Sequence, residues 1–270
     1  MILKKSNMEN QNTQRTDRLE VVVSLTSFPP AISYAVKAIQ SILQGDVLPD
    51  HLVLYLTLSE FQGQPLPAEL LSLAEQNPIF EIRNYDSNIR SYRKLIPALI
   101  DFPEATIVTI DDDVYYDRHM LRDLLRWNAV YPHAILAHRA KRIQPGRPYR
   151  EWKKYRWYHF LFKKINLGFC NLPTGVAGVL YPPHALKKEM LNPDLFFQIA
   201  PTTDDIWFWA AATAKGTPVL PIPFGHNKPK GLHKPKAISL KTENFKGATD
   251  KNAAALQAIL EHFPEISKSL

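Results

Sequence analysis

The sequence has 270 residues, of which 45% are hydrophobic and 22% are charged, with a formal net charge of +7. This composition is ordinary for a globular protein, and the length suits one large α/β domain or two small ones. No apolar run approaches the length of a membrane span. Cys170 is the only cysteine, which excludes an internal disulfide and a cysteine-built zinc site.

Residues 1–18 are polar and lack the apolar core of a secretion signal. We predict that they form a disordered leader and that residues 19–270 form a single domain. The missing signal and the single cysteine favour a cytoplasmic protein.

Apolar runs and helical patterns alternate along the first half of the chain. Buried strands are predicted at 20–26, 51–57, 79–83 and 106–110. Helices are predicted at 31–44, after Pro67, at 91–101 and at 117–128. This alternation predicts an α/β fold, with a mostly parallel central sheet and helices on both faces. Because no GxGxxG or Walker A motif occurs, standard dinucleotide and P-loop sites are not indicated.

The second half is less regular. A strand is predicted at 175–181, with Gly175 and Gly178 where the backbone approaches another group closely. A helix is expected to start at Pro182, and another to run from about Thr202 to a cap at Gly216. A strand at 218–222, a mobile loop at 225–251 and a helix at 252–262 complete the pattern.

Three consecutive carboxylates, Asp111, Asp112 and Asp113, follow the fourth predicted strand. Like charges side by side repel one another, and a hard divalent cation would relieve that repulsion. The carboxyl edge of a parallel sheet is also where open α/β proteins bind ligands. The alternative is a solvated acidic turn in which Asp113 caps the next helix.

Basic and aromatic residues are concentrated in residues 139–164, which hold ten Lys/Arg, seven aromatic residues and a single acid, Glu151. We treat residues 139–170 as an insertion in the domain, with a helix expected from about Tyr149. Such a composition suits an anionic membrane surface, an anionic glycan or nucleic acid. The alternative is a solvated face whose aromatic side chains pack on the domain.

The order of these features resembles the nucleotide-sugar-dependent glycosyltransferases of the GT-A fold. Their Asp-x-Asp motif, glycine-containing loop, acidic pair and late histidine have counterparts in residues 111–113, residues 175–178, Asp204-Asp205, and His226 or His233. Residues 24–29, 91–95, 109–114, 178–183 and 203–207 look more narrowly like bacterial glycosyltransferases associated with surface polysaccharide. The sequence departs from the family in having Asp-Asp rather than Glu-Asp, and in offering two histidines.

The resemblance implies a GT-A-like fold and a donor sugar linked to a nucleoside diphosphate. It implies that Asp113 contacts a metal directly, and that Asp111 lies near the ribose or a metal-bound water, with Asp112 between them. Oxygen ligands favour Mn²⁺ or Mg²⁺, and a histidine ligand favours Mn²⁺. Donor contacts are expected from Ser24, Thr26, Phe28, Arg90, Lys94, Asp111, Asp112, Gly178 and Lys228.

An inverting transfer needs a base that takes the proton of the acceptor hydroxyl. The resemblance gives this role to Asp205, with Asp204 as the alternative, and Trp207 and Trp209 are expected to wall a sugar site. The alternative is a helix start that the two acids favour through the helix dipole. His226 and His233 are expected to supply a metal ligand from a loop that closes over the diphosphate.

The function implied is metal-dependent sugar transfer to a glycan or lipid-linked acceptor, in bacterial surface polysaccharide (lipopolysaccharide or capsule) synthesis. Peripheral contact with the anionic inner face of the membrane is expected, and nucleic acid is not an expected partner. Two alternatives stay open: a two-metal phosphoesterase or nuclease using residues 111–113, and a non-catalytic glycan- or membrane-binding protein built on a transferase fold.

Overall fold

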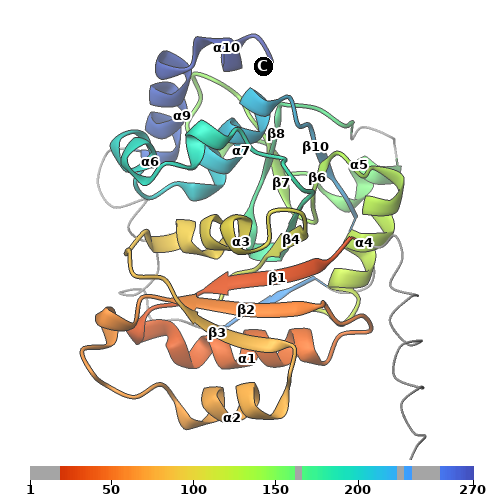
Figure 1. Cartoon of the computed structure of the whole chain (residues 1–270). Coiled ribbons are helices and arrows are strands. Elements are labelled where there is room, and N and C mark those ends of the chain that lie inside the picture. The colour runs from red at the N-terminus through yellow and green to blue at the C-terminus, as the bar shows by residue number, and fades with distance from the viewer. Residues whose placement is uncertain (1–18, 162–165, 224–227, 233–249) are drawn as a thin grey trace, which may run out of the picture.

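The structure is a computed structural model that describes residues 19–161, 166–223, 228–232 and 250–270. A seven-stranded sheet runs through its centre in the order β10-β6-β9-β4-β1-β2-β3 (Figure 1). Its strands are β1 (Val21–Thr26), β2 (His51–Leu56), β3 (Phe80–Asn84), β4 (Thr106–Thr109), β6 (Ile135–Ala137), β9 (Val179–Tyr181) and β10 (Val219–Pro221). Only β9 runs antiparallel to its neighbours, β4 and β6, so the predicted mostly parallel sheet is confirmed.

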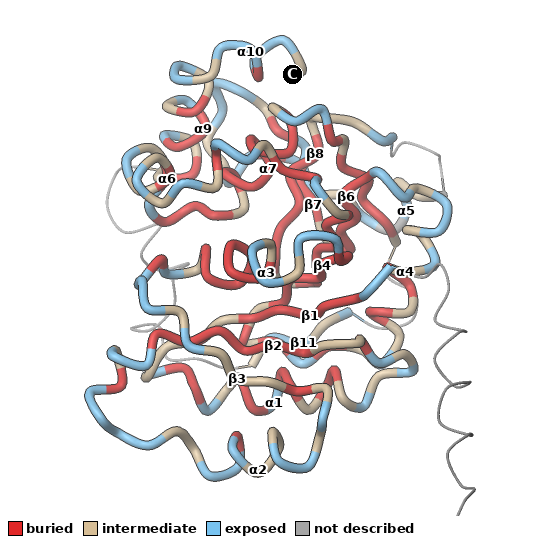
Figure 2. Tube along the Cα trace, in the orientation of Figure 1, coloured by how far each residue is buried: buried red, intermediate tan, exposed pale blue. Residues whose placement is uncertain are grey.

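Apart from the edge strand β3, the strands of this sheet are buried on both faces, which is why they read as continuous apolar runs (Figure 2). Side chains of a strand alternate between the faces, so that Val23 of β1 packs in one hydrophobic cluster and Val22 in another. Helices α1 (Ile32–Leu43), α2 (Ala68–Gln76) and α4 (Met120–Val130) contribute to the Val23 cluster. Helices α3 (Ile96–Asp101), α6 (Pro193–Ile199), α7 (Asp204–Lys215), α9 (Lys251–His262) and α10 (Pro264–Ser267) contribute to the Val22 cluster.

Short elements connect this framework. The 3-10 turns are η1 (Pro29–Ala31), η2 (Leu58–Phe61), η3 (Arg90–Lys94), η4 (Tyr149–Glu151), η5 (Gly175–Ala177) and η6 (Lys188–Leu191). Two further ribbons are antiparallel: β5 (Val114–Tyr115) pairs with β11 (Lys230–Gly231), and β7 (Ala140–Arg142) pairs with β8 (Asn171–Pro173). Residues 153–155 extend the second ribbon, since the Arg142 amide donates to the Lys153 carbonyl at 2.7 Å.

Several expected elements are different in the structure. The strand expected at 175–181 begins only at Val179, because Gly178 takes a left-handed backbone (φ 89°) after turn η5. No helix starts at Pro182; the chain turns there, with His184 at φ 57°, and α6 begins at Pro193 behind the cap residue Asn192. The predicted cap at Gly216 is confirmed, with φ 86°.

Two other segments need correction. The helix expected at 91–101 is divided at Leu95 into turn η3 and helix α3. In the basic stretch, Tyr149 starts only a single 3-10 turn, and the helix α5 (Trp157–Leu161) begins eight residues later. The leader at 1–18 and most of the loop at 225–251 lie outside the described residues. Within the part of the chain described, no helix has the length and apolar character needed to cross a bilayer.

Candidate active site

The acidic triplet lies at the carboxyl end of β4, in the turn between β4 and β5. Asp112 is buried, and its Oδ2 accepts a hydrogen bond of 2.5 Å from the Ser27 hydroxyl, just after β1. The Asp111 amide donates to the Tyr116 hydroxyl at 2.8 Å. The middle carboxylate is therefore part of the structural support of the turn, whereas Asp111 and Asp113 are only half-buried.

The antiparallel direction of β9 brings a second loop to this turn. Thr109 pairs with Val179 in the sheet, so the residues before β9 lie beside the residues after β4. Gly175 is the glycine that reaches the acidic turn. A Cβ atom at this position would lie 2.7 Å from Lys94 Nζ and 3.1 Å from Asp111 Oδ1, so only glycine fits without displacing the charged groups. Gly178 instead packs against Met120 of α4, where a Cβ would lie 2.9 Å from the sulfur.

A buried ammonium joins three carboxylates at this edge of the sheet. Lys94 Nζ, at the end of η3, lies 3.1 Å from Asp111 and 2.9 Å from Asp204. It also lies 3.9 Å from Asp205. The two aspartates begin helix α7, and the Ser91 hydroxyl donates to Asp204 at 2.9 Å. One ammonium among three carboxylates leaves an excess of negative charge, which suits a further cation.

The carboxylates of this cluster differ in their environment. The Asp205 carboxylate accepts a hydrogen bond from the Gly175 amide at 3.2 Å, and 30% of its side chain stays exposed. Burial raises the pKa of Asp205 to about 7; Lys94 opposes this rise, whereas Asp204 and Asp111 add to it. Burial works against the charge of Lys94, but the three carboxylates outweigh it, so the pKa of Lys94 lies above its ordinary value. Asp205 is therefore a carboxyl group able to exchange a proton near neutral pH.

The residue before Lys94 holds the strand ends in place. The buried guanidinium of Arg93 donates to the hydroxyls of Thr26 and Thr57 and, at 2.8 Å, to the Ser27 carbonyl. It also forms an ion pair of 3.0 Å with Glu60. Consecutive residues of η3 thus fix two parts of the site: Arg93 holds the ends of β1 and β2, and Lys94 holds the carboxylates.

The donor residues predicted from the sequence lie around this edge but in different settings. Ser24 is fully buried within β1, and the Thr26 hydroxyl is engaged by Arg93 and by the Tyr55 carbonyl. Phe28 is half-buried and Arg90 is exposed, with a left-handed backbone (φ 53°). Trp207 and Trp209 do not wall a sugar site, because both are fully buried in the core with their indole N–H groups bonded to the carbonyls of Met190 and Phe169.

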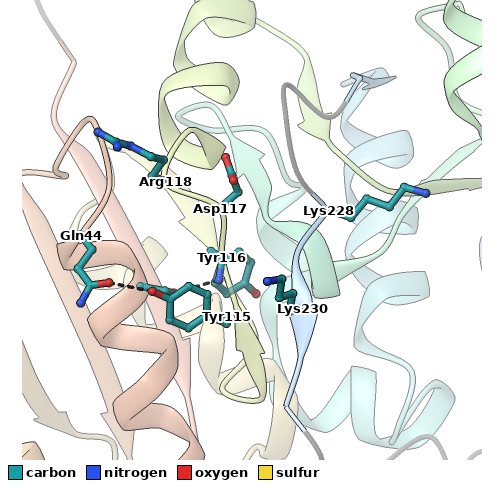
Figure 3. Close-up of a pocket in the computed structure, with 8 residues that line it drawn as sticks. Gln44, Tyr115, Tyr116, Asp117, Arg118, Lys228 and Lys230 are labelled. Carbon is teal, nitrogen blue, oxygen red and sulfur yellow. Dashed lines mark hydrogen bonds between the residues drawn. The ribbon is translucent and has the colours of Figure 1, made fainter.

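Lys228 lies apart from the cluster, in a pocket of about 400 Å³ on the α1 side of the acidic turn (Figure 3). The strand β11 that follows Lys228 pairs with β5, and the Leu232 amide donates to the Asp113 carbonyl at 2.6 Å. The segment 228–232 is thus fastened to the acidic turn. His226 and His233 lie outside the described residues.

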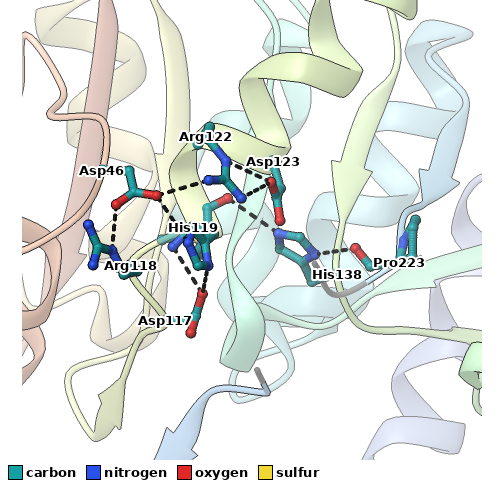
Figure 4. A network of polar contacts seen from close by, with 9 residues as sticks. Asp46, Asp117, Arg118, His119, Arg122, Asp123, His138 and Pro223 are labelled. Atoms are coloured by element: carbon teal, nitrogen blue, oxygen red, sulfur yellow. Dashed lines mark hydrogen bonds and ion pairs between the residues drawn. The ribbon is translucent and has the colours of Figure 1, made fainter. Parts of the chain in front are cut away.

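A network of ion pairs anchors the chain just beyond the triplet (Figure 4). His119 contacts Asp117 at 2.8 Å and Asp46 at 3.1 Å, and Arg122 contacts the same Asp46 at 2.9 Å. Asp46 follows α1, so this network ties the start of α4 to the far end of α1. The turn is consequently held from both sides, by Ser27 and by the Asp46 network.

The carboxylates of the acidic turn are candidate ligands for a divalent cation. Among the described residues, no group of three His, Cys, Asp or Glu side chains is placed to hold a metal ion. The half-buried carboxylates Asp111 and Asp113 nevertheless suit a hard cation that completes its coordination with phosphate oxygens and water, which is the usual arrangement for Mg²⁺ with phosphate substrates. The residues present fit a cation that arrives with a diphosphate.

Some supporting residues of the site carry little signal in the sequence. Ser27, Ser91 and Arg93 stand in segments 24–29 and 91–95, but nothing in their type or spacing gives their partners. For Gly175 the sequence predicts a close approach of the backbone to another group, and the structure confirms it without the sequence having named the partners. Its partners follow from the pairing of β9 with β4, which the sequence does not reveal.

No protein-family model matches the sequence, and no curated protein matches it in sequence. Solved structures do share the fold. The mannosyltransferase PcManGT from Pyrobaculum calidifontis, in complex with GDP-Man and Mn²⁺, matches with a TM-score of 0.52 and 14% identity, over 94% of this chain and 77% of that one. S. aureus TarS in complex with UDP matches with a TM-score of 0.53 and 11% identity, over 90% of this chain and 70% of that one. The expected α/β fold is therefore confirmed, and it is a fold shared with nucleotide-sugar glycosyltransferases.

Proposed function

We propose that the protein is a metal-dependent glycosyltransferase that moves a sugar from a nucleoside-diphosphate donor to a glycan or lipid-linked acceptor. The observation that carries this proposal is the charged cluster at the carboxyl edge of the sheet, in which Lys94 forms ion pairs with Asp111, Asp204 and Asp205. The similar mannosyltransferase structure holds GDP-Man and Mn²⁺, and the similar TarS structure holds UDP, which supports a nucleotide-sugar donor here.

Asp111 and Asp113 are the proposed metal ligands, with His226 or His233 as a further ligand. A divalent cation bound there would act as a Lewis acid that stabilises the charge of the departing diphosphate. Asp112 supports the turn that carries the two ligands, because its carboxylate accepts a hydrogen bond from Ser27. In this proposal the two outer carboxylates bind the cation and the middle one binds the protein. This division of roles explains how three consecutive carboxylates can stand in one turn.

Asp205 is the proposed general base of an inverting transfer. The acceptor hydroxyl oxygen forms a bond to the anomeric carbon of the donor, the bond from that carbon to the phosphate oxygen breaks, and the hydroxyl proton passes to the Asp205 carboxylate. A base is most effective when its pKa lies near the working pH, and burial raises the pKa of Asp205 to about 7. The carboxylate keeps partial exposure, as a group that must meet an acceptor requires.

Lys94, Ser91 and Gly175 are proposed to position this base. Lys94 and Ser91 both contact Asp204, the helix residue beside Asp205. The Gly175 amide donates to Asp205 directly, and the absence of a side chain at this position lets the backbone come close to Lys94 and Asp111. The nucleoside of the donor is proposed to lie over the end of β1, near Thr26 and Phe28, with Arg90 at its margin.

The acceptor is proposed to approach along the basic ribbon formed by β7 and residues 153–156. Lys141 is not available to it, because this lysine is buried and its ammonium donates to the Tyr149 carbonyl and lies over the Tyr149 ring. Four cations of the ribbon are exposed: Arg142, Lys153, Lys154 and Arg156. They support a role in surface polysaccharide synthesis, with the protein in the cytoplasm and in contact with the anionic inner face of the membrane.

The proposal is tested by a screen of nucleotide sugars for metal-dependent hydrolysis, which needs no acceptor. Release of a nucleoside diphosphate from one donor, with Mn²⁺ or Mg²⁺ and not without, is the expected result. If no nucleotide sugar is hydrolysed or bound in the presence of either metal, the proposed function is wrong. Adding candidate acceptors from surface polysaccharides to the active donor then identifies the acceptor.

A further inference from the structure

The antiparallel ribbon of β7 and β8 lies beside helix α7, whose first turn carries Asp205 (Figure 1). Arg139 comes just before β7. Its carbonyl continues the ladder by accepting hydrogen bonds from the amide and the hydroxyl of Thr174, at 2.9 and 3.2 Å. The residue after Thr174 is Gly175, whose amide donates to Asp205 at 3.2 Å. Thr174 and Gly175 therefore link the backbone of Arg139 to the proposed base.

Tyr149 is fixed on the face of this ribbon that Arg139 shares. Lys141 follows Arg139 by two residues, so the two side chains stand on the same face of the extended chain. The Lys141 ammonium lies 3.4 Å from the centre of the Tyr149 ring and donates to the Tyr149 carbonyl at 2.5 Å. The Tyr149 amide donates to Asp250 at 2.6 Å, and the centre of its ring lies 5.1 Å from that of the buried Trp152. The tyrosine is thus held from its backbone and from its ring.

The charges of the site act on the Tyr149 hydroxyl. Burial raises the pKa of Tyr149, the negative charge of Asp205 raises this pKa further, and the positive charge of Arg139 opposes the rise. Because interactions between charges weaken with distance, the hydroxyl lies near both groups. Together with the backbone link through Thr174 and Gly175, this places Tyr149 and Arg139 on one side of Asp205.

Tyr149 differs in exposure from other tyrosines near the acidic pair Asp204-Asp205. Burial and, after it, the charges of this pair raise the pKa of Tyr92 and Tyr181. Both of these tyrosines are at most 2% exposed, and the Tyr92 hydroxyl donates to a backbone carbonyl in the core at 2.5 Å. Tyr149 is only half-buried, so a bound molecule can reach it.

Arg139 brings a positive charge to the same side of the site. It is half-buried, and it forms no ion pair with a carboxylate in the ranges of the chain that the structure describes. Lys94, by contrast, is shared by three carboxylates. A guanidinium presents a planar set of donors that matches a carboxylate or a phosphate, and a tyrosine hydroxyl can add one more donor. An arginine and a tyrosine beside the proposed base therefore suit an anionic group on the molecule that approaches this base.

We propose that Arg139 and Tyr149 bind an anionic group of the acceptor, a carboxylate or a phosphate on the sugar whose hydroxyl faces Asp205. The inference rests on the proposed function, because it takes Asp205 as the base, and it adds the class of acceptor, which is an acidic rather than a neutral glycan. The two residues stand at the end of the basic ribbon along which the acceptor approaches. Lys141 is a positioning residue that holds Tyr149 in place.

Isothermal titration with methyl glucuronide, with and without a nucleoside diphosphate and Mn²⁺, is the first test. We expect the wild-type protein to bind methyl glucuronide and to bind the neutral methyl glucoside at least about tenfold more weakly, since a hydrogen bond to a charged group contributes about that factor. Arg139→Gln should lose the same factor towards methyl glucuronide, and Arg139→Lys, which keeps the charge, should lose less. The control Arg126→Gln removes an exposed arginine from α4, on the other face of the sheet, and should bind as the wild type does.

A phosphate probe and a tyrosine variant define the contact further. Methyl glucoside 6-phosphate that binds more tightly than methyl glucuronide would identify phosphate as the anionic group, and the reverse order would identify a carboxylate. Tyr149→Phe should weaken the binding of the preferred probe about threefold, since a neutral hydrogen bond contributes less. Tyr131→Phe, after α4, is the matched half-buried control. Equal affinity for charged and neutral probes, no binding of either charged probe, or wild-type affinity in Arg139→Gln overturns the inference.

Titration of a nucleoside diphosphate with Mn²⁺ separates this inference from the proposed function. If the wild-type protein binds the nucleotide but does not prefer the charged sugars, the acceptor assignment is wrong and the transferase function stands. If it binds methyl glucuronide through Arg139 but binds no nucleotide, the anion site stands and the transferase function fails. If Arg139→Gln loses nucleotide and methyl glucuronide affinity together, the arginine serves the donor diphosphate and the acceptor assignment is wrong.

Discussion

The Ser27 hydroxyl donates a 2.5 Å hydrogen bond to the buried carboxylate of Asp112, across 85 residues of sequence. This contact joins the end of β1 to the acidic turn after β4. The Arg93 guanidinium also donates a hydrogen bond to the Ser27 carbonyl. The carboxylate of the central residue of the triplet is thus fastened to the protein framework.

Ser27→Ala should therefore destabilise the protein. Removing the hydroxyl leaves a buried carboxylate without one of its donors, which costs about 1–3 kcal/mol of the free energy of unfolding. Denaturation by urea measures the loss, with the exposed Ser59→Ala as the control. A loss below about 0.5 kcal/mol, the usual size for surface substitutions, would show that the contact does not support the turn.

Asp113→Asn should abolish metal-dependent nucleotide binding while leaving the fold intact. The substitution removes one of two carboxylates available to a cation and keeps the size of the side chain. Titration of nucleoside diphosphate with Mn²⁺ measures the effect, and the exposed Asp86→Asn is the matched control. Wild-type affinity in a folded Asp113 variant would remove this residue from the metal site.

Asp205→Asn should retain donor binding and lose transfer. A base acts on the acceptor, so the affinity for donor stays while the rate falls about 10²–10⁴-fold. Donor titration and a transfer assay separate the two effects. Asp204→Asn should instead lower stability, because its carboxylate holds both Lys94 and Ser91. Normal turnover by the Asp205 variant, or retention of configuration in the product, would contradict the assignment.

His138 should make the stability of the protein depend on pH. Burial lowers the pKa of His138 from its ordinary 6.5, although its ring nitrogens contact the carbonyls of Pro223 and Met120. The unfolded chain then binds the proton more readily, so the free energy of unfolding falls as the pH drops below about 6.5. This loss continues until the pH reaches the lower pKa of the folded state.

Denaturation midpoints of the wild type and of His138→Gln, compared at each pH between about 5.5 and 7.5, test this dependence. The comparison is needed because Asp205, with its pKa raised to about 7, titrates in the same window and its contribution to stability falls as the pH rises. His138→Gln should flatten the decrease on the acid side, whereas the exposed His262→Gln should not. An equally steep decrease in the His138 variant would assign the effect to other groups.

The basic ribbon should bind anionic vesicles in a salt-dependent manner. The triple variant Lys153→Ser/Lys154→Ser/Arg156→Ser is expected to lose binding, because each cation near an anionic leaflet contributes about 1 kcal/mol. Co-sedimentation at low and high salt measures this. The exposed triple Lys37→Ser/Lys188→Ser/Lys215→Ser removes the same charge elsewhere. If both triple variants bind vesicles and acceptor as the wild type does, the ribbon is a solvated face.

The sequence predicted the first half of the fold well, because β1, β2 and β4 are buried on both faces and the helices carry apolar stripes. It predicted the second half less well. The short strand β9 and turn η5 were joined into one strand, since a glycine such as Gly178 inside an apolar run leaves its backbone conformation open. Pro182 was expected to start a helix, but His184 takes a left-handed backbone there.

The site was predictable to the level of residue types. The sequence predicts a site at Asp111 from its position after a strand, and at Asp204 and Asp205 from the resemblance of the motif order to a known family. The structure brings the three carboxylates together around Lys94. Lys94 itself was expected to face the donor, whereas it is buried beneath the carboxylates. The pairings of Lys94 with Asp204 and Asp205 join residues more than 100 positions apart, and no local pattern encodes them.

The place of β9 in the sheet has a consequence for how the protein folds. It lies between β4 and β6, although it is made after both, and among the described strands β10 is the only other one that pairs with β6. A growing chain that ends before residue 175 would therefore leave β4 with an open apolar edge and β6 without a partner. Open strand edges promote association between chains. Insertion of β9 closes the sheet and, in the same event, carries Gly175 to Lys94, so that completion of the fold and assembly of the charged cluster coincide.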